Sequence, residues 1–109
     1  MSLLVLSKKV IKPYRYHNCA RLINEMVDVL NDNTQKFGFI NYSPYYGDSY
    51  DFHVNDIEFW TISEWKSYNN WIKWSTSEER QNIIDKYEKD ILSEKHKILH
   101  KPISDIFLL

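Results

Sequence analysis

Three of the four tryptophans in this chain, Trp65, Trp71 and Trp74, fall within ten consecutive positions. On a helix, Trp71 and Trp74 would share one face, and Trp65 ends the segment that precedes it. Large rings in such a group either close one end of a small core or wall an apolar cavity in which a planar aromatic compound stacks. Both interpretations stay open at the level of the sequence.

Hydroxyl groups that could act on such a compound gather after the predicted second strand. Tyr42, Tyr45, Tyr46 and Tyr50 surround one polar loop. A phenol beside a substrate hydroxyl can pass on a proton or hydrogen-bond an oxyanion. Tyrosines in loops also cover the edge of a core, so Tyr42 is a candidate for either role.

The histidines offer a base and the possibility of a metal ligand. His53 lies between Asp51 and Asp56, so it is a candidate general base at a cavity mouth or part of a loop site for a divalent ion. His96 and His100 are four residues apart, which on a strand means four steps of ~3.3 Å, too far for one ion. The sequence therefore predicts no metal site.

Length and composition limit the class of protein. A chain of 109 residues forms one domain, residues 1–109, with residues 103–109 as a candidate C-terminal arm. The net charge of −1 gives no general attraction to nucleic acid or to an anionic membrane. Cys19 is the single cysteine, and no apolar run is long enough to cross a membrane. We expect a cytoplasmic protein with no nucleic-acid or membrane partner.

Hydrophobic periodicity predicts the elements that position these side chains. A stripe of apolar residues after the first strand indicates a helix, and Ser67 is the predicted N-cap of a second, short one. Ser75 and Glu78 have the spacing of a capping box, and so do Thr76 and Glu79. Two helix starts so close together in the sequence predict a broken helical segment. The predicted strands are residues 3–11, 37–42, 57–65 and 95–101.

The element order β-α-β-β-α-β predicts an α+β fold. With right-handed crossovers, this order builds a ferredoxin-like sheet that carries both helices on one face. Neither face of the third strand is wholly polar, so we expect both faces to meet protein over part of their length, and the open face of the sheet then needs a covering partner. We therefore predict a homodimer that forms through the open sheet face.

Lysines lie on the first and last strands, which are neighbours in this sheet order. A basic strip of this kind either holds an anion or nucleic acid, or it protects a sheet edge from aggregation. The near-zero net charge favours edge protection. The lysines are Lys8, Lys9, Lys12, Lys95, Lys97 and Lys101.

The motifs FGF at residues 37–39 and WKS at residues 65–67, together with Trp74, suggest a family. They resemble the start of the second strand, the end of the third strand and the second tryptophan of the antibiotic biosynthesis monooxygenase superfamily. The order of elements fits over nearly the whole chain. The resemblance implies a dimeric α+β barrel.

Members of that superfamily include cofactor-independent oxygenases of polycyclic phenols and haem-degrading monooxygenases. By resemblance, Trp65 matches a pocket tryptophan of the quinone-forming oxygenases, and Thr61 stands where they carry an asparagine. Trp74 matches a tryptophan of the haem-degrading branch. The axial histidine of that branch falls at Ile84, which cannot ligate iron, and its first-strand asparagine falls near Ser7.

The resemblance implies a cofactor-independent, monooxygenase-like protein that acts on or binds a small planar aromatic or quinone-type compound. The alternative is a non-catalytic barrel that binds a small ligand or has a structural role. No cofactor and no metal ion are expected. The candidate catalytic residues are Trp65, Thr61, His53 and Tyr42, and the candidate pocket residues are Trp65, Trp71, Trp74, Phe39 and Phe59.

Overall fold

The sheet is built around β1 (Leu3–Ile11), whose nine side chains alternate between buried and half-buried positions along its whole length. This period of two is expected of a strand that is fully covered on one side only. β3 (Ile57–Trp65) and β4 (Ile91–Leu99) pair with β1 on its two sides, both antiparallel. β2 (Phe39–Tyr46) pairs with β3, which gives the order β2-β3-β1-β4.

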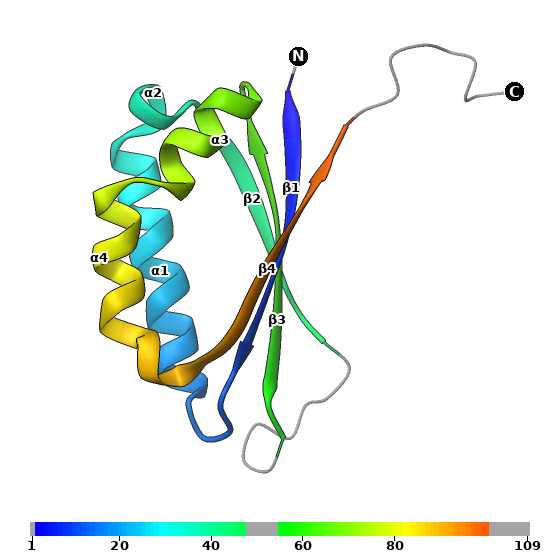
Figure 1. Cartoon of the computed structure of the whole chain (residues 1–109), viewed down its shortest axis with the longest axis vertical. Coiled ribbons are helices and arrows are strands. Elements are labelled where there is room, and N and C mark those ends of the chain that lie inside the picture. Colours follow the sequence, from blue (N-terminus) through cyan, green and yellow to red (C-terminus); the bar gives the residue numbers. More distant parts are fainter. Residues whose placement is uncertain (1, 48–54, 101–109) are drawn as a thin grey trace, which may run out of the picture.

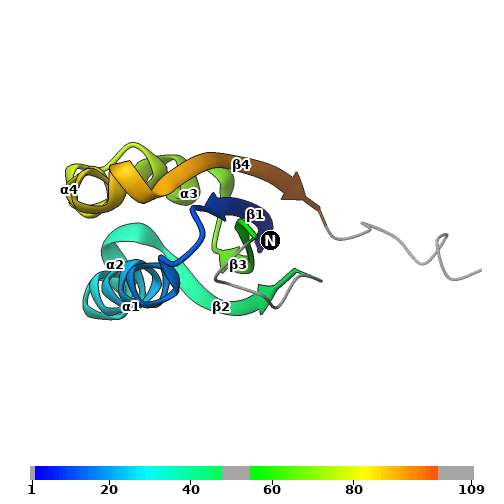
Figure 2. The same cartoon turned by 90° about the horizontal axis from the view of Figure 1, so that it is seen from below.

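The structure is a computed structural model that describes residues 2–47 and 55–100. All of its helices lie on one side of the sheet, where α1 and α4 run side by side (Figure 1). Seen from below, the helices and the sheet form two layers (Figure 2). The helices are α1 (Tyr16–Asp32), α2 (Thr34–Phe37), α3 (Tyr68–Ser75) and α4 (Glu78–Tyr87), with a 3-10 turn η1 (Glu88–Asp90) before β4.

The predicted α+β ferredoxin-like fold is confirmed by the element order and by the sheet topology. Two strands are longer than predicted. β2 runs through Pro44 to Tyr46, because an edge strand tolerates proline where the missing N–H would face solvent. β4 begins four residues earlier than predicted, directly after η1.

The candidate C-terminal arm, residues 103–109, lies outside the described residues. In the described part of the chain, no helix is long and apolar enough to span a membrane.

Gly38 ends α2, a short helix that the sequence analysis did not predict. Its φ angle of 60° is in the left-handed region that favours glycine. A Cβ atom at Gly38 would lie 2.4 Å from the Cγ atom of Asn70 in α3. Gly38 therefore allows α2 and α3 to approach closely at the end of the sheet where Trp65 lies.

Asp90 holds the start of β4 against the turn between β1 and α1. Its carbonyl oxygen accepts a hydrogen bond from the backbone N–H of Lys12, with 2.9 Å between the two atoms. Its carboxylate accepts from Nδ2 of Asn18 at 2.9 Å and lies 3.1 Å from Nε of Arg15. These contacts fix where β4 enters the sheet.

The predicted start of α4 is wrong by one or two residues. Ser77 is the N-cap, because its Oγ atom accepts a hydrogen bond from the backbone N–H of Arg80 at 3.1 Å. The hydroxyl groups of Ser75 and Thr76 instead donate to the carbonyl oxygen of Ile72, at 3.1 and 2.7 Å. Both residues belong to the end of α3, and their hydroxyls are therefore not available to cap α4.

We predict that Ser77→Ala lowers the free energy of unfolding by about 1 kcal/mol, the usual effect of losing an N-cap. The matched control, Ser75→Ala, changes it by less than about 0.5 kcal/mol, because that hydroxyl caps no helix. Urea denaturation followed by circular dichroism measures both. A larger loss for Ser75→Ala than for Ser77→Ala would contradict the assignment of the cap.

Candidate functional site

A cavity lies between the helix-facing side of the sheet and α1, α3 and α4. Its volume is about 60 Å³, counted as the space open to the centre of a water molecule. Aromatic rings form much of its wall, and charged and polar groups gather at one end. The aromatic residues are Phe39, Tyr42, Trp65, Trp71 and Trp74, and the polar residues are Ser7, Lys9, Thr61, Ser63, Arg80 and His96.

Local structure explains how the tryptophans reach the cavity. Ser67 caps α3, as predicted, by accepting a hydrogen bond from the backbone N–H of Asn70 at 3.2 Å. The helix then places Trp71 and Trp74 on the side that faces Trp65, the last residue of β3. The rings of Trp65 and Trp74 stack with 6.4 Å between their centroids.

Two phenylalanines complete this aromatic end. Phe39 lies edge-on to Trp65 at 5.4 Å between ring centroids, and Phe37 lies edge-on to Trp74 at 5.1 Å. Trp65 is 2% exposed and Trp74 is 4% exposed. The tryptophans thus serve both as core side chains and as walls of the cavity, so the two interpretations of the sequence are compatible.

Most of the predicted site residues come together. Tyr42, Thr61 and the three clustered tryptophans all line the cavity, as does Phe39. Burial, together with the charge of Asp28, raises the pKa of the Tyr42 phenol, which therefore stays protonated at neutral pH. Phe59 lies elsewhere, in a separate part of the core with Ile57 and Cys19. His53 lies outside the described residues.

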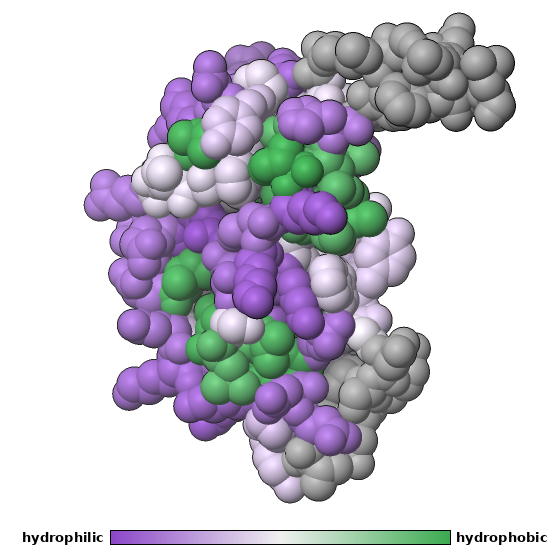
Figure 3. All heavy atoms as spheres, turned by 45° about the vertical axis from the view of Figure 1, so that its right-hand side comes forward, coloured by the Kyte–Doolittle hydropathy of each residue, from purple (hydrophilic) through white to green (hydrophobic). Residues whose placement is uncertain are grey.

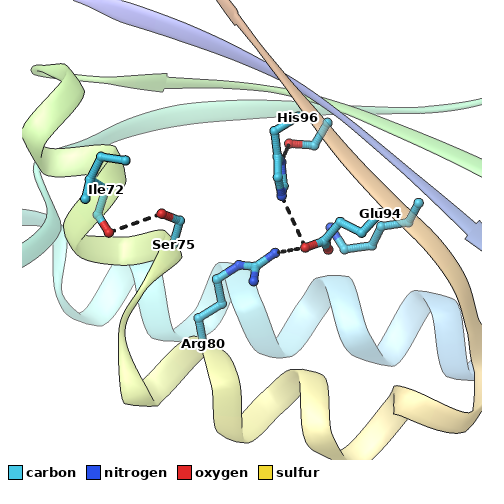
Figure 4. A network of polar contacts seen from close by, with 7 residues as sticks. Ile72, Ser75, Arg80, Glu94 and His96 are labelled. Atoms are coloured by element: carbon cyan, nitrogen blue, oxygen red, sulfur yellow. Dashed lines mark hydrogen bonds and ion pairs between the residues drawn. The ribbon is translucent and has the colours of Figure 1, made fainter.

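The polar end of the cavity contains a network that the sequence analysis missed. The Oγ atom of Ser7 lies 2.7 Å from Nδ1 of His96, and Nε2 of His96 lies 3.1 Å from Oε1 of Glu94. Arg80 donates a hydrogen bond to the same oxygen of Glu94. Nζ of Lys9 lies 3.2 Å from the other oxygen. Figure 4 shows Arg80 reaching from α4 and His96 pointing from β4 to one carboxylate.

Three members of this network are largely shielded from solvent. The side chain of Lys9 is 5% exposed, that of Arg80 is 11% exposed and that of Glu94 is 22% exposed. Burial lowers the pKa of Lys9, and the nearby carboxylate of Glu94 opposes this shift only in part. Burial also disfavours ionisation of Glu94, but the contacts with His96, Lys9 and Arg80 outweigh it and lower the pKa of that carboxyl group.

Lys9 also corrects the prediction about the lysines. β1 is a central strand, so its lysines do not protect an edge. Lys8 lies opposite Lys95 on the open face, whereas Lys9 points toward the helices between Ser7 and Ile11. The signal was present in the sequence, because Lys9 falls in the same phase as the apolar positions that β1 buries.

The described side chains do not fit a haem of the kind found in the haem-degrading branch. Ile84 packs against the core and offers no ligand atom at the place that the resemblance assigns to the axial histidine. Among residues 2–47 and 55–100, no three His, Cys, Asp or Glu side chains are grouped so that they could hold a metal ion.

We predict that Glu94→Gln lowers the free energy of unfolding at pH 7 by about 3–5 kcal/mol, because it leaves two buried cations without a counter-charge. The pKa of Glu94 is lowered in the folded protein, so the stability it contributes is present above its ordinary pKa of 4.5 and is lost as the pH falls below it. The difference between wild type and variant should therefore shrink at pH 3. Urea denaturation at both pH values measures it.

Glu79→Gln is the matched control, because Glu79 pairs with Lys36 at the protein surface. Its effect at pH 7 should be much smaller than that of Glu94→Gln, because solvent screens an exposed ion pair. An equal loss of stability for Glu94→Gln at pH 7 and at pH 3 would show that the charge of this carboxylate does not stabilise the fold.

No family model matches the sequence, and no curated protein matches it. Solved structures do share its fold. A conserved protein from Methanosarcina mazei Go1 superimposes with a TM-score of 0.74 at 16% identity, over 94% of each chain. An antibiotic biosynthesis monooxygenase superimposes with a TM-score of 0.70 at 17% identity, over 92% of this chain and 98% of that one.

The cofactor-independent oxygenase SnoaB from Streptomyces nogalater superimposes with a TM-score of 0.66 at 7% identity, over 94% of this chain and 95% of that one. Identities this low establish a common fold and nothing further. As far as the fold is concerned, the resemblance suggested by the motifs around Trp65 and Trp74 is confirmed. The chain has the fold of the antibiotic biosynthesis monooxygenases.

Proposed function

We propose that the cavity binds a small planar aromatic or quinone-type compound, and that the protein acts on it as a cofactor-independent monooxygenase. The observation that carries this proposal is the enclosure of one cavity by five aromatic side chains with a cluster of polar groups at one end. Apolar walls with a few convergent polar groups are the usual form of a small-molecule site. The fold shared with an oxygenase of this kind supports the choice of reaction.

In such a reaction the substrate itself supplies the electrons that reduce dioxygen. A phenol first loses its proton to a base, for which the imidazole of His96 in the cavity wall is the described candidate, because the phenolate is the better electron donor. One oxygen atom of dioxygen then forms a bond to a ring carbon, and the other leaves as water while the ring is oxidised to a quinone. Trp65, Trp71 and Trp74 would hold the ring, and the hydroxyl groups of Tyr42 and Thr61 would hydrogen-bond the oxygen atoms of the substrate.

A second candidate function is binding without reaction. It is favoured by Thr61, which stands where the resemblance places an asparagine. A threonine hydroxyl offers one donor, but it cannot present a carboxamide to a reduced dioxygen adduct. The protein would then be a carrier or a sensor of the same class of compound.

We predict that single-ring quinols quench the tryptophan fluorescence of the purified protein in a saturable manner, because three of the four tryptophans surround the cavity. Dissolved oxygen is followed in the same titration. Oxygen uptake that depends on the protein supports the oxygenase, and quenching without uptake supports the binding protein. An absence of quenching would count against both functions.

Trp71→Leu tests the cavity itself. Trp71 is half-buried, so its replacement should leave the fold intact, while the loss of one aromatic contact weakens binding about two- to tenfold. Trp60→Leu is the matched control, because Trp60 belongs to the opposite face of the sheet. Equal effects of the two substitutions would show that the quenching compound binds elsewhere.

We also propose that two copies associate through the open face of the sheet. On this face, a shallow hollow is lined by Leu6, Tyr45, Trp60 and Ile62, with Asp56 and Glu58 also in its wall. Figure 3, which brings this side of the molecule forward, shows a green apolar patch in its upper half with purple side chains beside it. Three strands of nine residues and one of eight make a face of about 20 by 30 Å, or roughly 600 Å². This area is at the lower end of the range of about 600–1,000 Å² that each partner buries in a standard interface.

We predict that Ile62→Lys shifts the protein from dimer to monomer, because a charge at the centre of this face would be buried without a partner. Size-exclusion chromatography with light scattering over a range of concentrations measures the mass. Tyr68→Lys is the control, because Tyr68 is 52% exposed on α3, on the helical side of the molecule. A wild-type protein that stays monomeric at high concentration would exclude this dimer.

A further inference from the structure

The polar end of the cavity has more positive than negative charge. Lys9 and Arg80 each carry one positive charge, and both face the carboxylate of Glu94. Ser7 and His96 complete the network beside them. Within the described part of the chain, no second carboxylate lies within ion-pair distance of either cation. With Lys9 protonated, the side chains of Lys9, Arg80 and Glu94 together carry a net charge of +1.

Burial makes the excess of positive charge energetically unfavourable. Both cations are almost fully covered, so water stabilises their charges only weakly. Each cation also has N–H groups to spare, since a guanidinium has five donors and an ammonium group has three. Their described contacts go to the one carboxylate of Glu94. An anion that entered the cavity would find both an uncompensated charge and unused donors.

The aromatic wall and the charged end are adjacent. The ring of Trp71 lies edge-on to the ring of His96, with 5.5 Å between their centroids. A flat ligand that contacts Trp71 thus reaches the network through a short polar substituent. We propose that the cavity selects an aromatic compound with one acidic group, bound as its anion by Lys9 and Arg80. This inference rests on the proposed aromatic-binding function and names the substrate class.

The volume of the cavity limits the number of aromatic rings that the ligand can have. About 10–15 Å³ of such space accommodates one water molecule, so about 60 Å³ holds roughly four to six of them. This corresponds to a single aromatic ring rather than a fused ring system. The ligand is therefore a monocyclic aromatic acid, such as a benzoate or an acidic phenol.

Benzoate and benzamide provide the test, because they have nearly the same shape and differ in charge. We expect isothermal titration calorimetry at pH 7 to show benzoate binding at least about tenfold more tightly than benzamide. Added salt should weaken the binding of benzoate and leave that of benzamide unchanged. This comparison uses the wild-type protein, so it does not depend on the folding of any variant.

Substitutions then test whether the network causes the tighter binding of benzoate. Arg80→Gln should reduce the affinity for benzoate to that for benzamide and leave benzamide binding unchanged. Lys8→Gln is the matched control, because Lys8 neighbours Lys9 in sequence but points to the open face, and it should preserve the tenfold preference.

The outcomes separate this inference from the proposed function. Equal binding of benzoate and benzamide, or tighter binding of benzamide, would overturn the selection of an anion and leave the aromatic cavity standing. A tenfold preference that survives Arg80→Gln would also overturn it, since the anion would then be held elsewhere. If neither compound binds, the aromatic-binding function fails together with the inference.

Discussion

The register of β1 between β3 and β4 is the constraint on which the cavity depends. Ser7 lies opposite Thr61 on β3 and opposite His96 on β4, so three polar groups meet on the helix-facing side of the sheet. Because side chains alternate along a strand, a shift of one residue would turn Ser7 and Lys9 to the open face.

The buried charges make sense as a binding device rather than as a source of stability. Replacing such a cluster with apolar side chains of similar size commonly leaves a protein as stable or more so. Breaking it by removing one partner is costly, so the network stays intact once it is formed. Its position beside a cavity with aromatic walls is typical of groups that recognise a ligand. Ser77 contributes indirectly, because the start of α4 that it caps carries Arg80.

The relatives in fold show how little of the sequence the architecture requires. Identities of 7–17% are compatible with superposition over more than nine tenths of this chain. What the fold needs is a period of two in four strands and an apolar stripe on the covering helices, and many side chains satisfy both. The polar side chains of the cavity are free of that requirement. Under the proposed function, these side chains and not the fold would therefore select the ligand.

The sequence by itself determined the elements whose pattern is local. The limits of β1 and β3 agree with the predicted residues 3–11 and 57–65, because alternation along a strand is set by adjacent residues. The grouping of Trp65, Trp71 and Trp74 at one site also followed from their spacing. The short helix α2 was missed, since four residues are too few to show a helical period.

Only the tertiary structure decided the chemistry at the polar end. Ser7 and His96 are 89 positions apart, and no local pattern connects them. Arg80 and Glu94 meet because the turn after α4 sends β4 back along the sheet beside β1. The capping residue of α4 was decided in the same way, by where α3 ends. Contacts of this kind depend on sheet register and helix placement, and these are settled only when the whole chain buries its apolar surface.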